Sequence, residues 1–162
     1  MAFSRFDKII QPKAIEYLRS KGYKVEADNE ITHDILVEGK KVECKFMQSV
    51  YQQFYIELYN CSDCKNCKDC NPNTQKDTLL GWGHRESYCK ADYIQLYHCR
   101  KEEIVQIATV KKEPFLDWLW DVHFAQQKTH TMITSWEGKH RTIGVAIPFN
   151  KIPEHLINIE RL

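Results

Sequence analysis

The chain has 162 residues, 43% of them hydrophobic and 28% charged, which excludes a disordered chain and fits one globular domain. Its formal net charge of +1 neither favours nor excludes a nucleic-acid partner, because a basic groove can be balanced by acids elsewhere. No apolar run approaches the length of a membrane span, and the N-terminal residues lack a signal-peptide core. We therefore expect a cytoplasmic protein without a membrane partner.

The first third of the chain predicts a helix followed by strands. Residues 12–21 are amphipathic, with Pro12 suited to a first turn and Gly22 to a stop. Short strands are expected over residues 24–27 and 33–37, and a tight turn at residues 38–40 leads into a strand over residues 41–46. A further strand over residues 54–59 alternates aromatic and aliphatic side chains and ends at a cysteine-rich segment.

The remaining sequence completes a single α/β domain over residues 1–162, interrupted by an insertion at about residues 60–78 that has almost nothing to bury. Strands are expected over residues 91–99 and 104–110 and a helix from about Pro114, whose apolar face is core. Residues 126–141 predict a polar, mobile loop. A last strand over residues 142–149 and a short tail follow.

Asp34, Glu43 and Lys45 form the pattern with the clearest chemistry. Glu43 and Lys45 are two residues apart and project from the same face of their strand, and the turn at Gly39 brings Asp34 near Glu43. Two carboxylates, with the backbone carbonyl of Cys44 as a third ligand, suit a hard cation such as Mg²⁺ or Mn²⁺. Such an ion activates water for attack at phosphorus, and a neighbouring lysine orients that water and offsets the developing charge.

These residues, Asp34 followed by Glu43-Cys44-Lys45 and preceded by the helix AIEYLRSKGYKV, resemble the PD-(D/E)XK or restriction-endonuclease-like nuclease superfamily. The resemblance covers about residues 12–60. It implies a mixed central sheet flanked by helices, metal-binding carboxylates, a lysine that assists the water, and hydrolysis of nucleic acid, with DNA favoured. It also implies that Glu16 on the helix supports the metal. His33 stands where the motif has proline, and the cysteine insertion is no part of the common core.

Less specific interpretations remain open. Glu and Lys two residues apart are common on a solvated strand edge, and Glu57 either faces the same centre or is solvated. The rival functions are a non-catalytic nucleic-acid-binding protein with a nuclease-like fold and a protein–protein adaptor that docks through the cysteine loop. The form of the substrate and the oligomeric state, a homodimer included, stay undetermined.

A second metal site is predicted by the strict C-x2-C-x2-C-x2-C spacing of Cys61, Cys64, Cys67 and Cys70. In a reducing compartment, four thiolates favour a closed, structural Zn²⁺ site that would fold the insertion, with an iron–sulfur cluster as the alternative. Because such short loops strain one tetrahedron, Cys89 or His84 is an alternative fourth ligand. Cys44 and Cys99 lie in predicted strands and are expected in the core.

Two further segments are candidates for nucleic-acid contact. Trp82 would stack on a base or lie in the core, while Arg85 and Lys90 would bind phosphates or be solvated. The segment with Lys128, His130, Trp136, Lys139, His140 and Arg141 is either a DNA-contacting flap or a surface loop.

Overall fold

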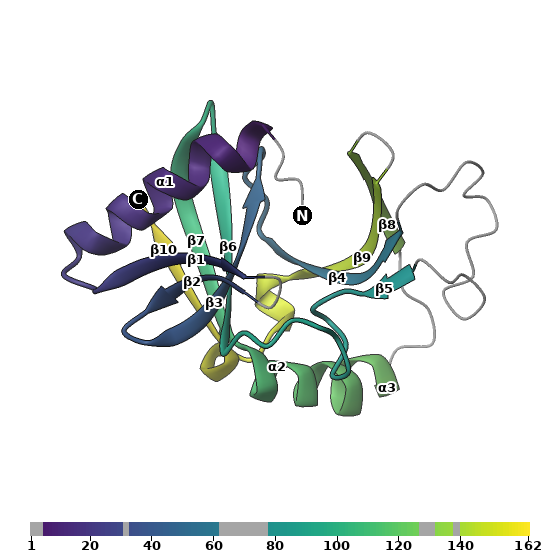
Figure 1. Ribbon diagram of the computed structural model, residues 1–162. Helices are drawn as coiled ribbons and strands as arrows, with labels where there is room; N and C mark the ends of the chain where they lie inside the picture. The colour runs from purple at the N-terminus through teal and green to yellow at the C-terminus, as the bar shows by residue number, and fades with distance from the viewer. Residues whose placement is uncertain (1–4, 31–32, 62–77, 127–131, 138–139) are drawn as a thin grey trace.

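The computed structural model describes residues 5–30, 33–61, 78–126, 132–137 and 140–162, which fold into two sheets and two helical segments (Figure 1). The cysteine insertion after Cys61 lies outside the described residues, as do parts of the predicted flap. Among the residues described, no helix is both long and apolar enough to cross a membrane.

Helix α1 (Arg5–Ser20) begins at Arg5 rather than at the predicted Pro12. Pro12 lies on the exposed side of the helix, so the loss of its N–H donor leaves the buried face intact. That face consists of Ile10, Ala14 and Leu18, four residues apart and 5% exposed or less. The helix ends at Ser20, one residue before the predicted end, and Gly22 lies in the turn that follows with a φ of +91° that favours glycine.

The larger sheet has six strands in the order β1-β2-β3-β6-β7-β10. Only the pair β3–β6 is parallel, and the other pairs are antiparallel, so the predicted mixed central sheet is confirmed. The strands are β1 (Val25–Glu30), β2 (His33–Val37), β3 (Lys40–Met47), β6 (Tyr93–Arg100), β7 (Glu103–Lys111) and β10 (Ile157–Arg161). The predicted short tail is wrong, because residues 157–161 pair with β7 and form an edge of the sheet.

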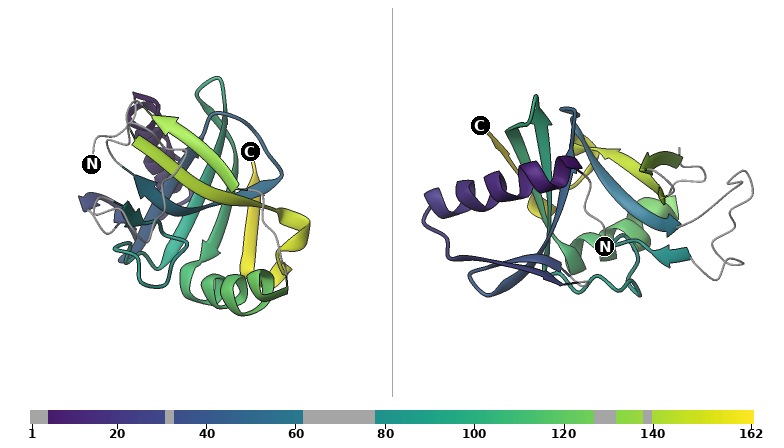
Figure 2. Two further views of the ribbon diagram at one scale, coloured as in Figure 1. Left: turned by 90° about the vertical axis from the view of Figure 1, so that its right-hand side faces the viewer. Right: turned by 45° about the horizontal axis from the view of Figure 1, so that its top comes forward.

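The smaller sheet is antiparallel, in the order β5-β4-β9-β8. Its strands are β5 (Thr78–Leu80), β4 (Gln53–Cys61), β9 (His140–Pro148) and β8 (Met132–Glu137). The predicted loop over residues 126–141 is therefore wrong at residues 132–137, which form β8, and at residues 140–141, which begin β9. Figure 2 shows that the strands of this sheet cross those of the larger sheet at a steep angle.

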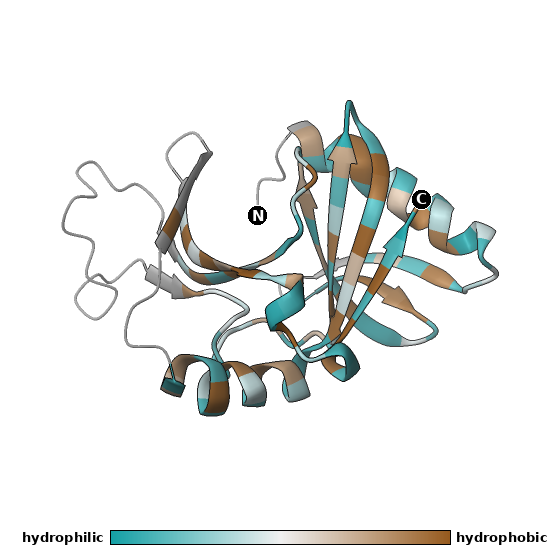
Figure 3. Cartoon of the chain, turned by 180° about the vertical axis from the view of Figure 1, so that it is seen from behind, coloured by the Kyte–Doolittle hydropathy of each residue, from teal (hydrophilic) through white to brown (hydrophobic). Residues whose placement is uncertain are grey.

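The two sheets diverge from a common base, and the helical segment lies beneath them (Figure 1). This segment consists of α2 (Lys112–Trp118), a π-helical turn (Leu119–His123) and α3 (Phe124–Gln126). Seen from behind, hydrophobic residues concentrate in the central strands and the turn between β6 and β7 is hydrophilic (Figure 3). Short 3-10 turns (Phe149–Lys151 and Glu154–Leu156) connect β9 to β10.

Two hydrophobic clusters hold these layers together. One lies between α1 and the larger sheet and includes Ala14, Leu18, Val42 and Cys44. The other joins the two sheets to α2 and includes Phe54, Leu96 and Phe115. A helix thus covers one face of the central sheet, whereas the other face is covered by the second sheet together with α2, rather than by helices alone.

Candidate active site

Asp34 and Glu43 are brought together by the β2–β3 hairpin. The hairpin turns at Glu38 and Gly39, both of which have positive φ, and its register pairs Ile35 with Val42. Beyond this pair, the N–H of Cys44 donates a hydrogen bond of 2.7 Å to Oδ2 of the Asp34 side chain. The carboxylate is therefore held against β3.

The alternation of β3 separates its apolar residues from its charged ones. Val42 and Cys44 are buried beneath α1, and Glu43 and Lys45 lie on the opposite face, toward the second sheet. The Lys45 Nζ atom is 2.8 Å from Glu43 Oε1 and 3.1 Å from Glu57 Oε2 of β4. The sequence left Glu57 open between a site residue and a solvated one, and the structure places it in the cluster.

Negative charge exceeds positive charge in this cluster, which holds Asp34, Glu43, Glu57 and a single lysine. Burial, reinforced by the charge of Glu43, raises the pKa of Asp34 from 3.8 to about 7, although Lys45 and the Cys44 N–H act in the opposite direction. Burial alone would lower the pKa of Lys45, but the charges of Glu43 and Glu57 outweigh it and raise that pKa well above its usual value. Lys45 is therefore a cation at neutral pH.

The acidic residue of α1 that acts on Asp34 is Asp7, whose charge adds to the upward shift of the Asp34 pKa. Glu16, the residue indicated by the family resemblance, is exposed and lines a hollow of about 640 Å³ between α1 and β1, with Lys8, Ile15 and Arg19 among its neighbours. Sequence reasoning missed Asp7 because the predicted helix began after it.

Two tyrosines lie around the cluster. The hydroxyl of Tyr55 on β4 is buried and makes no hydrogen bond among the described residues. Burial, followed by the charge of Glu57, raises its pKa. Tyr88 is half-buried, and burial raises its pKa to about 12 while the nearby Lys45 acts to lower it. Neither tyrosine was singled out by the sequence, since a strand tyrosine is usually a core residue.

The residues present fit a hard divalent cation. Within the described residues no three His, Cys, Asp or Glu side chains are arranged to hold a metal ion. Mg²⁺, however, usually retains several waters and is held by one or two carboxylates together with substrate phosphate oxygens. Asp34 and Glu43 supply two carboxylates whose mutual repulsion a cation would relieve. The carbonyl of Cys44 as a third ligand remains a prediction.

Most of the predicted cysteine cluster lies outside the described residues. Cys64, Cys67 and Cys70 lie outside the described residues, and Cys61 is described only as the last residue of β4. Cys44 and Cys99 are buried free thiols, as predicted.

The two alternative ligands of that cluster lie in different surroundings. Cys89 is 1% exposed within the main core. The ring of His84 lies 5.0 Å from the rings of both Tyr59 and Trp120. Its Nε2 is buried and makes no hydrogen bond among the residues described.

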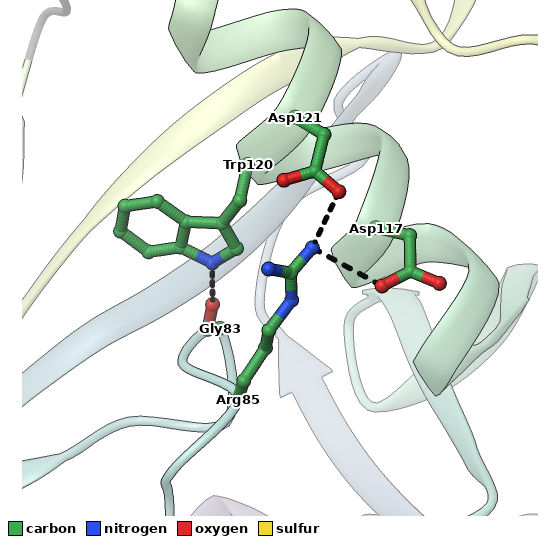
Figure 4. A network of polar contacts seen from close by, with 5 residues as sticks. All are labelled: Gly83, Arg85, Asp117, Trp120 and Asp121. Atoms are coloured by element: carbon green, nitrogen blue, oxygen red, sulfur yellow. Dashed lines mark hydrogen bonds and ion pairs between the residues drawn. The ribbon is translucent and has the colours of Figure 1, made fainter.

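Trp82 and Arg85 both have structural contacts. Trp82 is 2% exposed and packs edge-on against Phe54, so the core interpretation is correct. Arg85 forms ion pairs of 3.1 Å with Asp117 and 2.9 Å with Asp121, beside the 2.8 Å hydrogen bond from Trp120 to the Gly83 carbonyl (Figure 4). This network fastens residues 83–85 to the helical segment beneath the sheets.

Lys90, the other predicted phosphate ligand, lines a hollow of about 450 Å³ together with Arg85. Further basic residues of its wall are Lys111 and Lys112, but Asp92, Glu113 and Asp117 line it as well. The hollow therefore carries charge of both signs.

The predicted flap forms a strand pair where it is described. Trp136 pairs with Arg141 and Glu137 with His140, between β8 and β9. Lys128, His130 and Lys139 lie outside the described residues.

Comparison of the chain with protein-family models, with curated proteins and with solved structures finds no match.

Proposed function

We propose that this chain is a divalent-cation-dependent nuclease of the PD-(D/E)XK type that hydrolyses phosphodiester bonds, with DNA as the favoured substrate. The observation that carries the proposal is the meeting of the Asp34 and Glu43 carboxylates on neighbouring strands, with Lys45 on the same face as Glu43. The mixed sheet and the preceding helix α1 support a restriction-endonuclease-like fold.

The excess of carboxylates favours a catalytic over a structural interpretation. A structural ion pair needs one acid for one base, whereas Lys45 is in contact with Glu43 and Glu57 and Asp34 lies beside them. Such an arrangement is unfavourable in the metal-free protein and becomes favourable when a cation binds. A solvated strand edge would not bury Glu43, which is 5% exposed.

Each residue has a separate role in this proposal. Asp34 and Glu43 would hold Mg²⁺ or Mn²⁺, which when bound supplies a polarised phosphoryl oxygen and a water of lowered pKa. Lys45 is protonated, so it orients the attacking water and stabilises the charge that develops on the phosphoryl oxygens, rather than removing a proton. Asp7, whose charge acts on Asp34, would have the supporting role on α1 that the resemblance assigned to Glu16.

A cleavage panel tests the proposal. The purified protein is incubated with duplex, branched and single-stranded DNA and with RNA, in Mg²⁺, in Mn²⁺ and in EDTA. We expect cleavage that requires the metal and is abolished by Asp34→Ala or Lys45→Ala without loss of the fold. The exposed Lys13→Ala, which removes another lysine bound to a glutamate, serves as the control. Full activity of either site variant, or binding of nucleic acid without cleavage in every condition, would refute the proposal.

The cysteine segment is proposed to bind Zn²⁺ through Cys61, Cys64, Cys67 and Cys70, in a structural role. Elemental analysis and an absorption spectrum of the purified protein decide between zinc and an iron–sulfur cluster, because only the cluster absorbs visible light. Protein free of both metals would refute this part of the proposal and leave the nuclease centre untouched.

A further inference from the structure

Lys45 is shared by two carboxylates that come from different sheets. Glu43 lies on the same strand, and Glu57 lies on β4, with N–O distances of 2.8 and 3.1 Å. The side chain of Lys45 is 21% exposed and those of the glutamates are 7% and 15% exposed, so solvent screens these ion pairs only weakly.

The backbone at Glu57 is fixed by close contacts with three glycines. Gly144 lies opposite Glu57 in the β4–β9 pair, and the N–H of Gly83 donates a 2.9 Å hydrogen bond to the Glu57 carbonyl. A Cβ atom at Gly81 would lie 2.4 Å from that same carbonyl oxygen, and one at Gly83 2.8 Å from it. Only glycine allows such an approach, so these contacts set the direction of Glu57.

Charge balance indicates what Glu57 does for Lys45. When Asp34, Glu43 and Glu57 are all ionised, these carboxylates and the Lys45 ammonium carry a net charge of −2, which one divalent cation neutralises. If Glu57 were absent, Glu43 would be the one acid among the described residues still in ion-pair contact with Lys45, and the proposed cation needs that same carboxylate. The lysine and the cation would then compete for one ligand.

We propose that Glu57 is a positioning residue that holds the Lys45 ammonium beside Glu43, so that the lysine and a divalent cation occupy the centre together. This inference rests on the proposed nuclease function and adds that the second sheet completes the centre. The docking of β4 against β3 then determines whether the centre is assembled.

The test compares Mn²⁺ affinity, measured by calorimetry without nucleic acid, with cleavage kinetics. For Glu57→Gln we expect an affinity about tenfold lower and a kcat at least about tenfold lower, with the KM for DNA changed less than about threefold. Glu103→Gln is the matched control, because it removes the exposed partner of Lys13 at 2.7 Å, and should change neither quantity. Wild-type Mn²⁺ affinity and kcat in Glu57→Gln would overturn the inference.

A double-mutant cycle shows whether Glu57 acts through Lys45. In a Lys45→Met background, Glu57→Gln should change Mn²⁺ affinity less than about threefold, because there is no lysine left to hold. An equal loss in both backgrounds would mean that Glu57 binds the cation itself, and would refute the positioning role. Glu57→Asp, which retains the charge, should restore part of the kcat.

The two proposals fail in different ways. If the wild-type protein binds Mn²⁺ but cleaves no substrate, the nuclease proposal is refuted. The affinity measurements still decide the role of Glu57 in that case. A wild-type protein that binds no Mn²⁺ overturns the inference as well. If the double variant does not fold, the affinity and kcat of Glu57→Gln alone decide it.

Discussion

Replacing Asp34 by asparagine should abolish activity and yet stabilise the metal-free protein. Asparagine is neutral, and its amide oxygen can still accept the 2.7 Å hydrogen bond from the Cys44 N–H. The variant therefore removes the charge of Asp34 without disturbing the hairpin. Residues arranged for function commonly reduce stability in this way.

The magnitude follows from the pKa of Asp34, which burial and then the charge of Glu43 raise from 3.8 to about 7. An acid with a higher pKa in the folded protein contributes stability below about pH 4, and this contribution is lost as the pH rises to 7. Above pH 7 the full shift destabilises the wild type by at most about 4 kcal/mol. Asp34→Asn should remove this penalty at pH 8 and have little effect near pH 4.

Urea unfolding followed by circular dichroism, in EDTA at pH 4.5 and pH 8, measures the effect. Asp92→Asn is the matched control, because the exposed Asp92 carboxylate likewise accepts a backbone hydrogen bond, of 2.9 Å from Lys41. At pH 8 only Asp34→Asn should be more stable than the wild type, and added Mn²⁺ should stabilise the wild type more than this variant. A variant less stable than the wild type at pH 8 would refute the argument that the buried charge of Asp34 destabilises the metal-free protein.

Three further predictions concern the surroundings of the site. Asp7→Asn should lower the Mn²⁺ affinity about two- to threefold in the same calorimetric titration, whereas Glu16→Gln should leave it unchanged. A larger loss of affinity in Glu16→Gln than in Asp7→Asn would show that Glu16 is the supporting residue. Gly144→Ala should destabilise the fold by about 2–4 kcal/mol in urea unfolding, because its Cβ would lie 2.1 Å from the carbonyl oxygen of Ile56. Tyr55→Phe removes a buried hydroxyl without a partner among the described residues, so the free energy of unfolding should be unchanged or about 1 kcal/mol higher. A loss above about 1 kcal/mol would show that the hydroxyl is hydrogen-bonded in solution.

The β2–β3 hairpin could be predicted because every signal in it is local. Gly39 marks the turn, and alternation along β3 separates Val42 and Cys44 from Glu43 and Lys45. Because only nine residues and a tight turn separate Asp34 from Glu43 in the sequence, their side chains are expected to lie close together. The mixed sheet was instead implied by the resemblance to the nuclease superfamily, while local patterns predicted its strands over residues 91–99 and 104–110.

The extent of the pairing could not be predicted in the same way. Residues 157–161 form a strand because β7 offers them a partner, with Ile157 opposite Val110. Residues 132–137 lie within a longer segment rich in polar residues, which predicted a loop, and they form a strand by pairing with β9. Strand formation depends on a neighbour as much as on the strand's own residues.

The sequence by itself determined the chemistry of the centre, namely two carboxylates and a lysine at fixed positions on one hairpin. Only the tertiary structure decided which groups surround them, since it brought Glu57 from the second sheet to Lys45 and the charge of Asp7 within reach of Asp34. The physical reason is that side-chain periodicity within a strand is a local property. The position of Glu57 depends instead on contacts between segments far apart in the chain, here the close backbone packing of glycines 81, 83 and 144 against β4.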